Sequence, residues 1–176
     1  GIAAGILMAI SNSILKLAID LDPTPGAIAD LMNRVLYQTG GSRDFMTLFL
    51  GILEPTSGRL EYISVGHPYP LLRSASGAIS ELGCGSLPLG IRQTIDPTPG
   101  FVTLEPGDLV VMVTDGIPEA VNTEGQTYGF ERLWELVSEG GSPDEVHRRI
   151  VADLETFTAG TAPHDDWSLV VLRRDR

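Results

Sequence analysis

The sequence is poor in several residue types, and each scarcity excludes a class of protein. The single cysteine, Cys84, cannot form a disulfide within the chain and is typical of a reducing compartment. Lys and Arg number 12 against 23 Asp and Glu, and the net charge of −11 disfavours nucleic acid and anionic membranes as partners. Polar residues from Ser11 to Lys16 interrupt the apolar N-terminal segment before it could span a bilayer. No basic start of a secretory signal precedes it. We therefore expect a cytoplasmic protein without membrane insertion.

The residues that are present suit one folded domain. The chain has 176 residues, of which 43% are hydrophobic and 20% charged, as in soluble globular proteins. The acidic excess is compatible with cation binding, although solvated surface carboxylates are the commoner cause of such a charge. Cys84 lies in a GCGS loop and is interpreted as a spare small residue.

The N-terminal part predicts two helices. Residues 2–19 place apolar side chains one helical turn apart and on flanking positions, so we expect this helix to be packed on two sides. The segment DLDPTPG ends it, and Thr24 followed by Pro25 predicts the start of a second helix. The expected buried face of this second helix, over residues 25–37, consists of Ile28, Leu31, Met32, Val35 and Leu36.

The middle of the chain predicts strands joined by short turns. Residues 45–53 are apolar on both faces and are expected to be covered on both, and the turn EPTSG leads to a second strand at 59–65. A further hairpin is expected over 70–82, followed by a surface loop rich in Gly and Pro over 83–100. Residues 101–114 predict a strand, a Pro-Gly turn and another strand.

The last third predicts two helices and a closing strand. The first helix is expected to place Phe130, Leu133, Trp134 and Val137 on one buried face. Ser142 with Glu145 predicts a capping box for the second helix. The chain closes with DDWSLVVLRR, a polar loop and a strand. Short turns link the strands, and helices lie before and after them. We therefore predict an α+β fold, an antiparallel β-sandwich flanked by helices, in a single domain over 1–176.

Acidic residues lie at the ends of two apolar strands. Asp115 follows the run from Leu109 to Val113, and Asp165 and Asp166 precede WSLVVL. If these strands are adjacent and antiparallel, the carboxylates converge and repel each other unless they are protonated or bind cations. Mg²⁺ and Mn²⁺ prefer such oxygen ligands, and Gly116 lets the backbone turn sharply beside them. The alternative is that Asp115-Gly116 is only a turn and Asp165-Asp166 only a loop.

The surroundings of these residues are more specific. VVMVTDGIPEAVNTEGQTYGFERLWEL, followed by HDDWSLVVLRR, closely resembles the sporulation stage II E (SpoIIE) type of PPM, the metal-dependent serine/threonine phosphatases. The resemblance extends upstream through MTLFLGILEPTSGRLEYISVGHPYPLLR and SLPLGI to GIAAGILMA, and covers essentially the whole chain in order. It implies the αββα fold of the PPM phosphatases.

The resemblance also implies a site and a reaction. In this family a binuclear Mn²⁺ or Mg²⁺ centre binds the substrate phosphate and activates a water for in-line attack at phosphorus. By their match to the family's motifs, Asp115 and Asp165 are implied as catalytic metal ligands. Gly116 is implied as a weaker contact of the metal site, and Asp166 as a residue that orients its neighbours by hydrogen bonds.

One motif of the family does not occur in this sequence. The first metal motif, Gly-Asp-Val-x-Gly-(His/Lys)-Gly, carries an aspartate that bridges both metals, and Gly1 resembles its last glycine. We therefore expect a domain that lacks its N-terminal strands and this motif, with impaired catalysis by the chain as written. The alternatives are an inactive pseudo-phosphatase that acts as a signalling or interaction module, and a structural cation-binding domain.

Partners are implied by the resemblance as well. Family members commonly dephosphorylate a phosphoserine protein, an anti-sigma-factor antagonist, in bacterial signalling, and often carry an upstream sensor domain. The two N-terminal helices are candidates for a homodimer contact. Other polar residues near the motifs are interpreted as structural: His67 and His164 as loop residues, and Glu119 and Asn122 as helix-surface residues first and neighbours of the site second.

Overall fold

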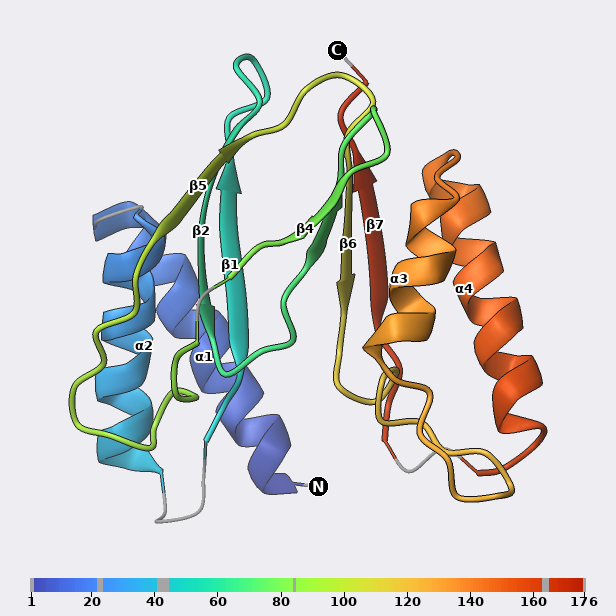
Figure 1. Cartoon of the computed structure of the whole chain (residues 1–176). Coiled ribbons are helices and arrows are strands. Elements are labelled where there is room, and N and C mark those ends of the chain that lie inside the picture. The colour runs from blue at the N-terminus through green and yellow to red at the C-terminus, as the bar shows by residue number, and fades with distance from the viewer. Residues whose placement is uncertain (1, 22–23, 41–44, 84, 163–164, 176) are drawn as a thin grey trace. The chain divides into compact units, whose positions relative to one another are not determined.

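The computed structural model describes residues 2–21, 24–40, 45–83, 85–162 and 165–175. Contacts divide the chain into unit 1 (Gly1–His67 and Gly83–Thr103) and unit 2 (Pro68–Leu82 and Leu104–Arg176), each with one antiparallel sheet and two helices (Figure 1). In chain order the elements are α1 (Ile2–Leu21), α2 (Pro25–Thr39), β1 (Leu48–Leu53), β2 (Arg59–Val65), β3 (Leu71–Arg73), β4 (Ile79–Glu81), β5 (Gly100–Thr103), β6 (Leu109–Val113), α3 (Phe130–Ser138), α4 (Pro143–Thr158) and β7 (Leu169–Arg173). The predicted α+β class with antiparallel strands is confirmed.

Unit 1 combines α1 and α2 with a sheet of order β1-β2-β5. The predicted hairpin pairs β1 with β2, and α2 contacts both of these strands. Thr24 caps α2 as predicted, because its hydroxyl oxygen accepts a hydrogen bond from the Ala27 N–H at 3.4 Å. The core of the unit contains Ala18, Ile28, Met32, Leu36, Val65 and Leu89.

A buried asparagine ties the Gly- and Pro-rich loop of unit 1 to α2. The Asn33 side chain is fully buried; its Oδ1 accepts from the Gly90 N–H at 2.9 Å, and its Nδ2 donates to the Arg92 and Gln93 carbonyl oxygens at 3.1 and 3.3 Å. Three hydrogen bonds satisfy an amide that would otherwise be costly to bury. The loop predicted to wrap the surface is therefore anchored at this point.

Unit 2 has a sheet of order β4-β3-β6-β7, with α3 against β3 and α4 against β7. The predicted capping box starts α4: Ser142 Oγ accepts from the Glu145 N–H at 3.3 Å, and Glu145 Oε2 accepts from the Ser142 N–H at 2.7 Å. The core of this unit is formed by Leu71, Leu109, Val111, Val113, Ile117, Ala120, Tyr128, Leu133, Val137, Val146, Ile150 and Leu154.

The strand pair that matters most for the site is β6 with β7. The two strands are antiparallel neighbours, with Val113 opposite Leu169, as the acidic motifs required. The strands predicted over 101–114 are also found, but β5 pairs with β2 and β6 pairs with β3 and β7, so they belong to different sheets. The turn between them is held by Asp108, whose carboxylate accepts from the Glu105 and Ala75 N–H groups at 2.8 Å each.

Two expectations of burial in unit 1 are wrong. Apolar side chains on α1, Ile6, Met8, Leu17 and Ile19, are between 50% and 67% exposed, so the described part of this helix is not packed on two sides. The strand predicted over 45–53 begins at Leu48, and Ile52 is 37% exposed.

Among the described residues, no helix combines the length and the apolar character needed to cross a membrane.

The aromatic residues of α3 also differ from expectation. Phe130 and Trp134 are 42% and 38% exposed, whereas Leu133 and Val137 are buried. A short helix that rests on a sheet buries only a narrow stripe, and residues at the flank of that stripe stay partly in solvent. Apolar spacing identified the helix correctly but assigned too wide a buried face to it.

Candidate metal centre

The two acidic motifs lie at the same end of the β6–β7 pair. Asp115 follows β6 after one residue, and Asp165 and Asp166 lie just ahead of β7. The pairing continues past the strands: the Thr114 N–H donates to the Ser168 carbonyl oxygen at 3.1 Å, and the Ser168 N–H donates to Thr114 Oγ1 at 3.0 Å. The antiparallel strands thus bring the motifs together.

Gly116 marks where the two motifs touch. A Cβ atom at this position would lie 2.5 Å from the Asp166 carbonyl oxygen and 3.4 Å from the Asp165 Cβ. The first distance is far inside van der Waals contact, and the obstacle is a backbone atom that cannot swing away. Glycine is needed here for the close approach of two backbone segments. The approach places Asp115 and Asp165 on adjoining turns.

The carboxylates of both turns keep most of their hydrogen-bonding capacity. Asp115 Oδ1 accepts from the Gly116 N–H at 3.0 Å, and Asp165 Oδ1 accepts from the Asp166 N–H at 2.8 Å. Both residues are exposed, and neither forms an ion pair with a basic side chain in the part of the chain that the structure describes. Two such carboxylates with vacant lone pairs fit a hard divalent cation that keeps several water ligands.

The predicted convergence of three carboxylates is not found. No group of three or more His, Cys, Asp or Glu side chains is arranged to hold a metal ion within the described ranges. Asp166 instead turns its main chain toward the site: its carbonyl oxygen faces Gly116 and accepts from Thr114 Oγ1 at 3.3 Å. The side-chain role predicted for Asp166 stays a prediction.

The segment after Gly116 is a series of turns rather than the helix that we expected to carry Glu119. The Glu119 N–H donates to the Asp115 carbonyl oxygen at 2.9 Å, which returns the chain toward the site. Glu119 lines a small cavity with Gly116 and Asp165. Asn122 lies farther along, where its Oδ1 accepts from the Glu124 and Gln126 N–H groups and closes a turn.

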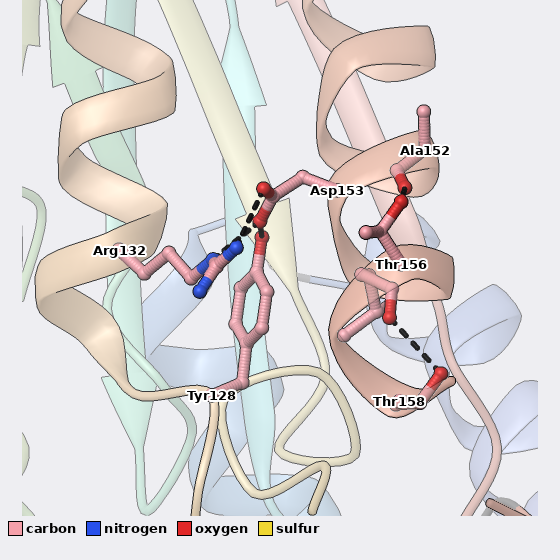
Figure 2. Close-up of polar contacts among 7 residues, drawn as sticks. Tyr128, Arg132, Ala152, Asp153, Thr156 and Thr158 are labelled. Atoms are coloured by element: carbon pink, nitrogen blue, oxygen red, sulfur yellow. Dashed lines mark hydrogen bonds and ion pairs between the residues drawn. The ribbon is translucent and has the colours of Figure 1, made fainter. Parts of the chain in front are cut away.

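A second polar cluster in unit 2 joins the end of these turns to both helices (Figure 2). The Arg132 guanidinium donates to both carboxylate oxygens of Asp153 at 2.6 and 2.8 Å, and the Tyr128 hydroxyl donates to the same carboxylate at 2.8 Å. The Arg132 guanidinium also lies 5.1 Å from the Phe157 ring centroid. Asp153 is thus saturated by partners, unlike Asp115 and Asp165.

The pKa values of this cluster follow from these contacts. Hydrogen bonds from Arg132, and then from Tyr128, hold the pKa of Asp153 below its usual value, against the opposing effect of partial burial. Burial, together with the hydrogen bond to Asp153, raises the pKa of the Tyr128 hydroxyl well above its usual value. At neutral pH the cluster therefore holds an ionised pair and a neutral phenol.

The two histidines and the cysteine singled out from the sequence belong to unit 1 or lie outside the described residues. His67 belongs to unit 1, where its Nδ1 lies 3.3 Å from Thr47 Oγ1, and its carbonyl oxygen accepts from Ser64. His164 and Cys84 lie outside the described residues. Sequence reasoning missed Thr161 and Trp167, which line the same cavity as Glu119. The position of Trp167 directly after the acidic pair was the available signal.

Comparison with known proteins identifies the family of this chain. The profile of the family described as Stage II sporulation protein E (SpoIIE) matches residues 1–175. The chain belongs to the SpoIIE family. Among curated relatives, the phosphoserine phosphatase RsbU of Bacillus subtilis is 30% identical over 98% of this chain and 53% of that protein. The chain therefore spans about half the length of RsbU.

Solved structures of a PP2C domain and of a SpoIIE phosphatase domain show the same fold. The SiaA-PP2C domain of Pseudomonas aeruginosa superposes with a TM-score of 0.85 at 17% identity, over 98% of this chain and 71% of that one. The phosphatase domain of SpoIIE from Bacillus subtilis, presoaked with Mn, gives 0.63 at 18% identity, over 96% and 73%. These likenesses confirm the predicted fold for this member of the SpoIIE family.

Proposed function

We propose that this chain is part of a metal-dependent protein phosphatase that hydrolyses phosphoserine or phosphothreonine. The observation that carries the proposal is the contact of Gly116 with the Asp165-Asp166 backbone, which brings two carboxylates without cationic partners onto adjoining turns. Membership of the SpoIIE family and the similarity to a phosphoserine phosphatase support the same activity.

Each residue of the site has a proposed role. Asp115 and Asp165 hold Mn²⁺ or Mg²⁺, in the two-ion centre that the family resemblance implies, and Gly116 keeps the backbone close enough for both to take part. A bound ion of this type lowers the pKa of a water and neutralises the phosphoryl oxygens as charge develops. Thr114 and Ser168 fix the two turns relative to each other through their paired hydrogen bonds. Asp166 orients neighbouring groups.

The proposed substrate is a phosphorylated anti-sigma-factor antagonist in a bacterial signalling pathway. RsbU is named a phosphoserine phosphatase, and the family resemblance of the motifs points to the same kind of substrate. An upstream sensor domain and a homodimer contact through α1 and α2 belong to this proposal. The exposed apolar residues of α1 support the contact. A cytoplasmic location suits the single cysteine.

A second candidate function is a non-catalytic interaction module. It is favoured by one observation: the described residues hold no group of three metal-ligating side chains. Such a module would keep the fold and the partner surface while binding metal weakly or not at all.

Hydrolysis by the full-length protein distinguishes the two functions. We expect release of phosphate from p-nitrophenyl phosphate and from a phosphoserine protein in the presence of Mn²⁺, its loss on addition of EDTA, and its return when Mn²⁺ is restored. Inactivity toward both substrates with Mn²⁺ and with Mg²⁺ would exclude the phosphatase and leave the interaction module.

A further inference from the structure

A small cavity opens beside the two acidic turns. It has a volume of about 70 Å³ and is lined by Gly116, Glu119, Ala120, Val121, Thr158, Thr161, Ala162, Asp165 and Trp167. A space of this size holds the end of one side chain but no large group. Because Gly116 and Asp165 form part of its wall, anything bound there lies next to the proposed metal centre.

One polar atom of the cavity lacks a partner. Thr161 Oγ1 is buried and makes no hydrogen bond to any residue that the structure describes, although a buried hydroxyl without one is costly and uncommon. The neighbouring Thr158 hydroxyl is different, because it donates to the Leu154 carbonyl oxygen at 3.0 Å, one turn earlier in α4 (Figure 2). Thr161 therefore has an unsatisfied hydroxyl in the wall of this cavity.

The lining has more hydrogen-bond acceptors than donors and carries negative charge. Glu119 and Asp165 contribute carboxylates, the Thr158 hydrogen is already used, and the described lining includes no Lys, Arg or His. Asp165 is committed to the metal under the proposed function, so Glu119 remains as the acceptor for a ligand. Ala120, Val121 and the Trp167 ring supply an apolar wall. An aromatic ring also attracts cations.

These properties fit one kind of side chain. A lysine end consists of methylene groups that pack on apolar surface and a compact ammonium with three donors. The larger planar guanidinium of arginine suits a cavity of about 70 Å³ less well. We propose that this cavity is a specificity subsite that receives a lysine side chain of the phosphoprotein substrate, close to the phosphorylated residue. This inference rests on the proposed phosphatase function.

Peptide hydrolysis by the full-length protein tests the subsite. The substrates are phosphoserine peptides that carry lysine, its uncharged isostere norleucine, or arginine at each of the three positions on either side of phosphoserine. At one of these positions we expect kcat/KM for lysine to exceed that for norleucine about tenfold, with arginine between them. Glu119→Gln and Thr161→Val should lower this ratio about threefold or more.

Matched controls separate the subsite from general effects. Glu135→Gln and Thr156→Val make the same changes at exposed residues outside the cavity and should keep the lysine-to-norleucine ratio. A ratio near one at every position, or a ratio that survives both cavity variants, would overturn the subsite. If p-nitrophenyl phosphate is still hydrolysed in that case, the phosphatase function stands without it.

A binding measurement decides the question even if hydrolysis fails altogether. The full-length protein labelled with ¹⁵N-tryptophan is titrated with n-butylammonium, and the indole signal of Trp167, assigned through Trp167→Phe, is followed by NMR. We expect a saturable shift that n-butanol does not cause and that Glu119→Gln weakens at least about threefold. A missing shift, or an equal shift with n-butanol, would exclude the ammonium subsite.

Discussion

Unit 2 contains two groups of carboxylates with opposite surroundings. Asp153 accepts three hydrogen bonds, two from Arg132 and one from Tyr128. The carboxylates of Asp115 and Asp165 each accept a described hydrogen bond only from the N–H of the next residue. A carboxylate with three hydrogen bonds stabilises the fold, whereas carboxylates without an ion pair among the described residues can bind a ligand. We therefore assign a structural role to Asp153 and a functional role to Asp115 and Asp165.

Removing a carboxylate from each group should give opposite results. Asp115→Asn and Asp165→Asn should lower the Mn²⁺-dependent phosphatase activity of the full-length protein by at least about 100-fold, because a lost metal ligand costs more than a lost neighbour of one. Their free energy of unfolding without metal should be unchanged or slightly higher, since like charges are removed. Steady-state kinetics and urea unfolding measure the two quantities. Full activity of either variant would remove that residue from the site.

Gly116→Ala sharpens the comparison by disturbing the contact between the two turns without changing charge. The added Cβ would lie 2.5 Å from the Asp166 carbonyl oxygen, so one backbone segment must move. We expect a loss of about 2 kcal/mol in unfolding free energy, typical of overpacking, together with weaker Mn²⁺ binding. Gly26→Ala is the control, because a Cβ there meets nothing within 4 Å. Equal stability of the two variants would show that the contact is not tight.

Asp153→Asn tests the other side of the comparison. We expect the free energy of unfolding to fall by about 1–2 kcal/mol at pH 7, a modest loss because the Arg132 side chain is 41% exposed and solvent screens the pair. Phosphatase activity should stay within about threefold of the parent at a temperature at which both proteins are folded. The exposed pair of Arg34 with Asp30 is the control, and Asp30→Asn should cost less than about 0.5 kcal/mol.

The cost of Asp153→Asn should depend on pH in a defined direction. The pKa of Asp153 is lowered in the folded state, so its stabilising contribution is fully present above the unfolded-state value of about 3.9 and is lost as the pH falls through the folded value. The difference in unfolding free energy between parent and variant should be constant from pH 7 to about pH 4 and shrink below that. A difference that shrinks above pH 5 would contradict the assigned cause.

The two groups also differ in how far the sequence could predict them. Asp115 and Asp165 sit beside apolar strands, and strand pairing alone brought them together, because β6 and β7 are adjacent and antiparallel. The bond between Tyr128 and Asp153 joins residues 25 positions apart, and helix packing rather than local pattern decides it. The sequence could not predict the turns that contain Glu119 either, since the apolar spacing after Gly116 also suits a helix.

The burial of helix side chains was also only partly predictable from the sequence. Apolar spacing correctly identified α1 and α3, and the capping box correctly identified the start of α4. Spacing could not say how wide a stripe each helix would bury, which is why Phe130 and Trp134 are partly exposed. The width of that stripe depends on what lies against the helix, and this is a property of tertiary packing.

Arg132→Lys distinguishes the contribution of the positive charge from that of the two-pronged hydrogen bond to Asp153. It should have the smallest effect on the free energy of unfolding. Lysine keeps the positive charge but cannot donate to both oxygens of Asp153 as the guanidinium does, nor can it stack its planar group between Tyr128 and Phe157. We expect a loss of about 0.5–1 kcal/mol in unfolding free energy, roughly half of that for Asp153→Asn. The loss should change little between 0.1 and 1 M salt, because the missing hydrogen bond is short-ranged whereas the remaining charge attraction is screened in both proteins.

If Arg132→Lys were as costly as Asp153→Asn, the bidentate geometry would carry the whole stabilisation. If it cost nothing, Asp153 would need only a nearby positive charge, and its difference from Asp115 and Asp165 would be the presence of a cation alone.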